Sequence, residues 1–141
     1  MTFPLSGLLR VRGVQERAAA ENLSRASDQR EQAEAARERT AASLAEIGSA
    51  VGDAQTLLAM AAARAAGRSS LSDLQSLIEL RRDEEADAKT AHVEARRELK
   101  GLERLESAHR AHAVKTELDA EQSALDEIAV ARAARREGSA A

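Results

Sequence analysis

Three side chains that could bind a metal ion lie one helical turn apart: Glu106, His109 and His112. Residues three positions apart share a face of an α-helix, so one carboxylate and two imidazoles could reach one ion. A metal site also needs a converging further ligand and hydrogen bonds that orient the imidazoles. Asp28 could complete such a site, but the chain has no cysteine and only one more histidine. The pattern therefore favours ordinary half-exposed polar residues, and we expect no metal and no cofactor.

No other stretch has the residues of a catalytic site. The segment GSAVG at 48–52 lacks the lysine and the preceding strand of a phosphate-binding loop. Asp83, Glu84 and Glu85 form a run of carboxylates that we interpret as a solvated face, because a pair of helices has no cleft to shift their pKa values. We therefore expect no enzymatic activity and no small-molecule substrate.

The composition indicates which elements position these residues. The chain of 141 residues has one aromatic residue, Phe3, and one proline, Pro4, and alanine, leucine, arginine and glutamate dominate the rest. These are the strongest helix formers, so long helices are expected. The interleaved charges, with a net charge of −3, argue against nucleic-acid binding. No segment approaches the ~20 apolar residues of a membrane span, and the N-terminus lacks the basic region of a signal peptide, so we expect a cytoplasmic protein.

Apolar or small residues recur at alternating steps of three and four along two stretches. This 3.5-residue period is typical of the seam of a coiled coil. The first seam comprises Leu23, Ala26, Arg30, Ala33, Ala36, Thr40, Leu44, Ile47, Val51, Ala54, Leu58 and Ala61. The second comprises Leu74, Ile78, Arg81, Glu85, Ala88, His92, Ala95, Leu99 and Leu102, and continues to Leu118, Leu125 and Ile128. The pattern predicts two long helices.

The first seam breaks at residues 65–75. Gly67 there is a candidate helix terminator, and Ser72 and Gln75 have the spacing of a capping box that opens a second helix. A short connection favours an antiparallel pair, so we predict an all-α fold, an antiparallel two-helix coiled coil forming a single domain over residues 1–141. Helix 1 is expected at about 4–65, the turn at about 66–71, helix 2 at about 72–136 and a short disordered tail at 137–141.

The position of the turn sets which residues face each other. A turn near Arg68 would place Leu44 opposite His92. It would also place Leu8 opposite Ile128 and Val11 opposite Leu125, so that both termini close the same end. The alternative is that the first helix stops at Gly48, because Gly48 and Gly52 each cost about 1 kcal/mol relative to alanine inside a helix.

Segments near both ends of the chain resemble the flagellar export protein FliJ family. Phe3 followed by LLRVRGVQERAAAE at 8–21 is similar to the opening of that family. ELKGLERLESAHRAH at 98–112 and EQSALDEIAVARAARR at 121–136 are similar to its C-terminal helix, including the Leu-Glu-Arg-Leu motif and the terminal arginine cluster. The resemblance extends over essentially the whole chain.

The resemblance implies a non-enzymatic, stalk-like component of the flagellar type III export apparatus. Such a protein is a cytoplasmic hairpin at the flagellar base, peripheral to the cytoplasmic membrane. It acts between the ring of the export ATPase FliI and the export gate protein FlhA, and export chaperones are further candidate partners. The expected ring-binding tip comprises Leu8, Arg10, Arg12, Leu125, Ile128, Arg132 and Arg135. By themselves, the C-terminal arginines would equally suit a basic helix end that complements the helix dipole.

Four apolar residues near the expected turn lie outside the seams: Leu57, Met60, Leu77 and Leu80. Two of them would belong to each helix, and residues at a spacing of three lie together on a helix surface. Because the resemblance implies a gate contact in this half of the hairpin, we expect these four residues to form the FlhA-binding patch. Two alternatives remain: a coiled-coil stalk or scaffold of another secretion system or ATPase, and a homo-oligomeric structural coiled coil.

Overall fold

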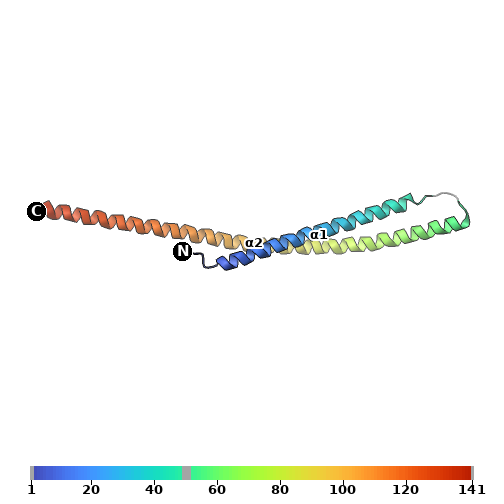
Figure 1. Cartoon of the computed structure of the whole chain (residues 1–141), viewed down its shortest axis with the longest axis horizontal. Coiled ribbons are helices and arrows are strands. Elements are labelled where there is room, and N and C mark those ends of the chain that lie inside the picture. The colour runs from blue at the N-terminus through green and yellow to red at the C-terminus, as the bar shows by residue number, and fades with distance from the viewer. Residues whose placement is uncertain (1, 49–51, 141) are drawn as a thin grey trace. The chain divides into compact units, whose positions relative to one another are not determined.

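The computed structural model describes residues 2–48 and 52–140, which form two α-helices packed against each other in an antiparallel hairpin (Figure 1). Helix α1 spans Ser6–Glu46 and helix α2 spans Ala54–Ala140. No strand occurs among the described residues. The predicted all-α fold is therefore confirmed. In the described part of the chain, no helix is long and apolar enough to cross a membrane.

The chain divides into two compact units, each built from parts of both helices. Unit 1 comprises residues 1–13 and 97–141, and unit 2 comprises residues 14–96. Among the described residues, the buried side chains are Ala26, Ala33 and Ile78 in unit 2 and Leu102 in unit 1. Both cores are thin because alanine fills many of the contact positions and each missing aliphatic group forgoes burial.

The predicted seams coincide with the protected positions of both helices. Each seam residue from Leu23 to Leu44 is buried or half-buried in α1, and Ile47, just after the end of this helix, is half-buried. The same holds for each one from Leu74 to Leu102 in α2. Val51 lies outside the described residues, and Ala54, Leu58 and Ala61, which were assigned to the first helix, are exposed residues of α2. The 3.5-residue period therefore identified the contact faces up to Leu102. Leu118, Leu125 and Ile128, which continued the second predicted seam, are exposed.

The predicted turn at residues 66–71 is wrong, because these residues lie inside α2. Helix α1 ends at Glu46, far short of residue 65, so the alternative break at Gly48 is the one that occurs. Helix α2 then begins with Asp53 as its N-cap. The Oδ1 atom of Asp53 accepts hydrogen bonds from the backbone nitrogen of Thr56 at 2.8 Å and from its hydroxyl at 2.6 Å. This cap satisfies a backbone donor that the first helical turn leaves unpaired.

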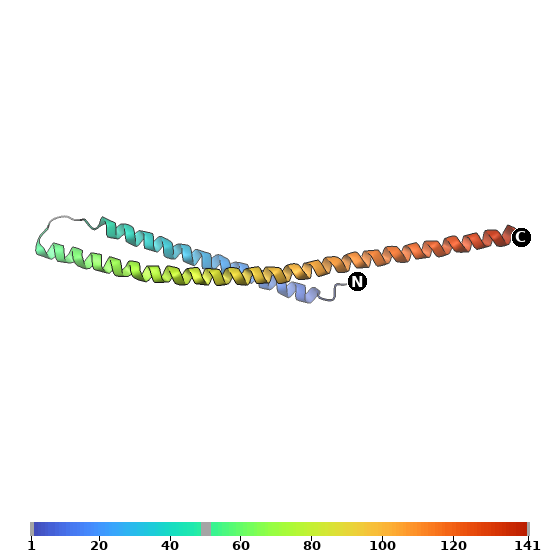
Figure 2. The same cartoon turned by 180° about the vertical axis from the view of Figure 1, so that it is seen from behind.

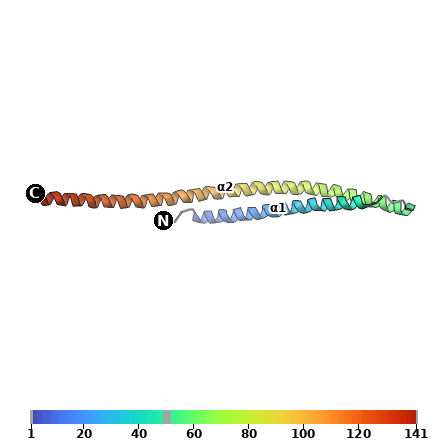
Figure 3. The same ribbon diagram turned by 90° about the horizontal axis from the view of Figure 1, so that it is seen from above.

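Gly67 has a packing role instead of ending a helix. A Cβ atom at this position would lie 2.8 Å from Cδ1 of Leu44 on α1. The two helices approach closely here because residue 67 has no side chain. The antiparallel pairing that follows is visible in two perpendicular views, with α1 beside α2 (Figures 1 and 3).

The corrected turn also corrects the pairing of the helices. In unit 2, Leu44 faces Gly67 instead of His92, and His92 instead lies 3.0 Å from Glu16. In unit 1, the ring of Phe3 packs against the ring of His109, so the start of α1 lies beside residues near His109 of α2 and not beside the end of α2. The predicted contacts of Leu8 with Ile128 and of Val11 with Leu125 are therefore wrong.

Helix α2 continues for a long way beyond its last protected position. Ala113 is half-buried, and every described residue from 114 to 140 is exposed. Among the described residues of unit 1, no helix lies beside this part of α2 (orange to red in Figure 2). The predicted disordered tail at 137–141 is also wrong for its described residues, because α2 reaches Ala140. We call residues 114–140 the C-terminal segment.

Candidate binding surfaces

The Glu-x-x-His-x-x-His pattern does not converge on a metal ion. The ring of His109 packs on Phe3, with ring centroids 5.5 Å apart and planes tilted by 57°. Oε1 of Glu106 accepts a hydrogen bond from Arg110 at 2.8 Å, and His112 is exposed. No group of three or more histidine, cysteine or acidic side chains is placed to hold a metal within residues 2–48 and 52–140. The geometry gives His109 a packing role with the N-terminal residue Phe3.

The structure separates the expected ring-binding residues into two groups within unit 1. Leu8, Arg10 and Arg12 lie on the first turns of α1, and Arg12 forms an ion pair with Glu98 of α2. The other four residues, Leu125, Ile128, Arg132 and Arg135, all lie in the C-terminal segment. From Glu98 to Leu125 the helix rises by about 40 Å at 1.5 Å per residue. The two groups therefore do not form one tip.

The expected gate-binding residues are likewise not one patch. All four lie on α2, where Leu57 and Leu80 are separated by about 35 Å of helix. The side chains of Leu57 and Leu80 are 51% and 52% exposed, whereas Met60 and Leu77 are half-buried. Leu77 lines a groove with Leu74 and Ala33, so it contributes to the packing of the hairpin.

A polar cluster between the helices of unit 2 was missed because the facing residues were wrongly paired. One carboxylate oxygen of Glu85 accepts a hydrogen bond from the Ser27 hydroxyl at 2.6 Å, and the other accepts one from Nε of Arg30 at 2.6 Å. Arg30 also donates to Glu34, which in turn pairs with Arg82. The sequence did contain a signal for this pair: Arg30 and Glu85 are oppositely charged residues at seam positions of the two different helices.

The environment of Glu85 shifts the ionisation of both partners. The hydrogen bond from Ser27, followed by the one from Arg30, lowers the pKa of Glu85 below its usual range. The hydrogen bond to Glu85 raises the pKa of Arg30. The expectation that Glu85 belongs to a solvated charge run is therefore wrong, because its charge is held between the helices.

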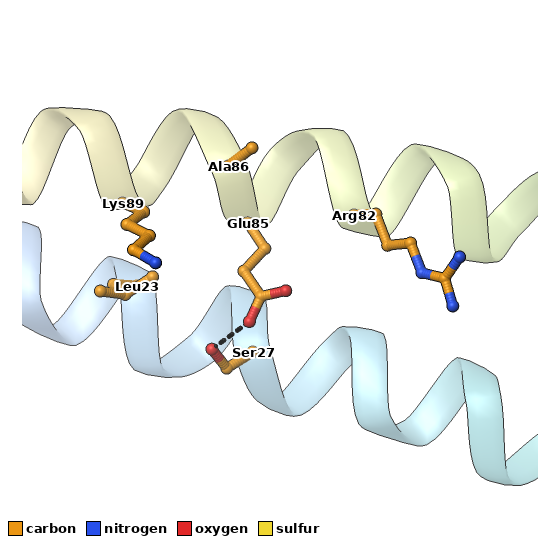
Figure 4. A pocket seen from close by; sticks show the side chains of 6 residues that line it. All are labelled: Leu23, Ser27, Arg82, Glu85, Ala86 and Lys89. Atoms are coloured by element: carbon orange, nitrogen blue, oxygen red, sulfur yellow. Dashed lines mark hydrogen bonds between the residues drawn. The ribbon is translucent and has the colours of Figure 1, made fainter.

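An open groove runs beside this cluster (Figure 4). Its volume is about 410 Å³, and the residues that line it are Leu23, Ser27, Arg82, Glu85, Ala86 and Lys89. Figure 4 shows Ser27 and Glu85 pointing toward each other across the helix pair, joined by their hydrogen bond. The Ser27 hydroxyl donates to the Glu85 carboxylate across the two helices of unit 2, so this hydrogen bond helps to fix their pairing.

A second interhelical polar contact lies further along unit 2. Nε2 of His92 lies 3.0 Å from Oε1 of Glu16, and both side chains are about one-fifth exposed. The pairs His92–Glu16 and Arg30–Glu85 thus lie between the helices, at positions where leucine would bury more apolar area. Polar residues at such positions specify the alignment of a coiled coil at a cost in stability.

These features define a class: an antiparallel two-helix coiled coil with polar pairs between its helices. The family model described as "Flagellar FliJ protein" matches residues 1–138. The chain belongs to the FliJ family, as the resemblance of residues 8–21, 98–112 and 121–136 indicated. No curated protein and no solved structure is significantly similar to it. Membership implies a role connected with flagellar protein export, in a family of export components that are not known as enzymes.

Proposed function

We propose that the chain is a stalk and adaptor between the ring of the flagellar export ATPase FliI and the export gate protein FlhA. It would act at the cytoplasmic face of the membrane at the flagellar base, without catalysis of its own. The observation that carries the proposal is the C-terminal segment, in which α2 extends without a covering helix. A protruding helix with exposed apolar and basic side chains is suited to insertion into a partner.

The ring contact is proposed for four residues of this segment. Leu125 and Ile128 are 61% and 48% exposed, and Arg132 and Arg135 follow one and two turns later. The aliphatic pair supplies apolar area, and the arginines supply attraction to an acidic surface and sensitivity to salt. Leu8, Arg10 and Arg12 are not included. They lie on the first turns of α1, where Arg12 pairs with Glu98, and Glu98 is about 40 Å along α2 from Leu125.

A binding measurement with purified FliI tests the ring contact. Replacing Arg132 and Arg135 by glutamate should weaken binding at low salt by about tenfold and reduce its salt dependence. The matched control is Arg10→Glu with Arg104→Glu, which changes the net charge equally at exposed positions of unit 1. Equal weakening by both double variants would show that binding depends on overall charge and would refute the proposed site.

The gate contact is proposed for two exposed leucines of unit 2, Leu57 and Leu80. Leu57→Ser and Leu80→Ser are tested singly, because the two residues are too far apart to belong to one small patch. Replacing the leucine that contacts FlhA should abolish FlhA binding while the helical circular dichroism signal stays unchanged. Ala59→Ser, at an exposed position of the same helix, is the control. Unchanged FlhA binding in both leucine variants would place the contact elsewhere.

A further inference from the structure

The C-terminal segment carries the pattern of a coiled-coil seam for which α1 supplies no partner. Its residues at alternating steps of four and three are Val114, Leu118, Glu121, Leu125, Ile128, Arg132 and Arg135. All of them are exposed, including the four aliphatic side chains. A seam with this period is completed by a second helix that wraps around the first.

The charges of the segment are separated along its length. Residues 117–127 contain five acidic side chains and no basic one, whereas residues 128–136 contain three arginines and no acidic one. A parallel, in-register copy would place Glu121 against Glu121 and Arg132 against Arg132 at the seam. Like charges at facing seam positions oppose association, so the parallel arrangement is disfavoured.

An antiparallel copy reverses this situation. When Leu125 of one copy lies opposite Ile128 of the other, Glu121 falls opposite Arg132 and Leu118 opposite Arg135. The two-fold symmetry of the pair repeats each of these contacts. The aliphatic residues then meet at the centre, with a Glu–Arg pair on either side. The stem of each outer arginine can cover Leu118 while its guanidinium stays in water.

We propose that the C-terminal segment binds a second copy of this chain, antiparallel, with Leu125 opposite Ile128. The contact covers residues that the ring contact also uses, so a paired chain and a ring-bound chain are alternative states. The pairing is argued from the segment's own charge pattern and does not rest on the ring contact. Because few aliphatic groups meet, the dimer is weak and depends on protein concentration.

Charge reversal in the full-length chain tests the arrangement by sedimentation equilibrium. Glu121→Arg alone and Arg132→Glu alone each place like charges opposite one another twice in the dimer. Each should weaken dimerisation by about tenfold. The double variant Glu121→Arg with Arg132→Glu exchanges the two charges and should restore the wild-type dissociation constant to within about threefold. A parallel dimer would not be rescued by this exchange, because like charges would still face each other.

Cross-linking identifies the pairing directly. Mixed Leu125→Cys and Ile128→Cys chains should form a disulfide between the two different variants faster than either variant forms one with itself. A chain that stays monomeric at all concentrations would overturn the proposal. A dimer that is insensitive to both single reversals, or that cross-links fastest through two copies of Leu125→Cys, would overturn it as well. None of these measurements includes the ATPase, so their failure leaves the ring contact to its own test.

Discussion

A disulfide between positions 44 and 67 distinguishes the observed hairpin from the one expected with a turn near Arg68. A Cβ atom at Gly67 would lie 3.7 Å from Cβ of Leu44, which is close to the mean separation of about 3.8 Å in natural disulfides. The chain has no cysteine of its own, so the variant Leu44→Cys with Gly67→Cys contains only this pair. We expect it to oxidise within one chain.

The stabilisation follows from the loop that the bond closes. Residues 44–67 form a loop of about 24 residues, for which the chain-entropy relation gives about 3.5 kcal/mol at 25 °C. Comparing the oxidised and reduced forms of the same variant removes the effect of losing the Leu44 side chain. Thermal unfolding followed by circular dichroism, with and without reductant, measures this difference. A non-reducing gel establishes that the product is a monomer.

The matched control is Leu44→Cys with His92→Cys, the pair that a turn near Arg68 would bring together. In the structure His92 lies beside Glu16, about 40 Å along α1 from Leu44, so this variant should not oxidise within one chain. If instead the control oxidises and the 44–67 pair does not, the turn lies near Arg68. Residues 44 and 67 would then belong to one helix, about 35 Å apart.

Three further perturbations test local features of the hairpin. Gly101→Ala should raise the free energy of unfolding by about 1 kcal/mol, because nothing lies within 4 Å of the added methyl group. Gly67→Ala should raise the free energy of unfolding by less, since the side chain of Leu44 must move. Equal increases for both variants in denaturant titrations would contradict the close approach of the helices at Gly67. Asp53→Ala should fray the first turn of α2, seen as faster amide exchange at Thr56, and unchanged exchange would show that the cap is dispensable. Glu85→Gln should be less stable than the wild type at neutral pH. Because the folded state lowers the pKa of Glu85, its contribution is present above the ordinary value of 4.5 and is lost as the pH falls below it. The difference between the melting temperatures of the wild type and Glu85→Gln should therefore decrease from pH 7 to pH 3.5. A constant difference would show that the ionised Glu85 side chain does not stabilise the folded state.

The contact faces of the helices could be predicted from the sequence, but the pairing of those faces could not. The period of apolar and small residues depends only on helix geometry, so the positions from Leu74 to Leu102 were identified without knowing their partners. The pairing depends on where the chain turns, and two segments offered similar signals. Ser72 and Gln75 have the spacing of a capping box, while Asp53 and Thr56 form the cap that the structure uses.

The choice between the two breaks depends on tertiary contacts that a single sequence does not reveal. A glycine that ends a helix and a glycine that lets two helices approach look alike in sequence. Gly67 is the second kind, because Leu44 occupies the space of its missing side chain. The interhelical pair of Arg30 and Glu85 was hidden for the same reason: both residues were placed on the seams, but the wrong turn gave them the wrong neighbours.

The alanines that leave little apolar area in the hairpin have a different effect in the C-terminal segment. Isolated helices are marginal in water, and most helices in proteins depend on packing for their persistence. Residues 114–140 contain seven alanines, the residue with the strongest intrinsic preference for the helix. A segment that already populates the helical conformation before it meets a partner loses less conformational freedom on binding. The alanines therefore lower the entropic cost of ordering the segment when it binds. This contribution to the binding free energy is separate from that of the side chains that contact the partner.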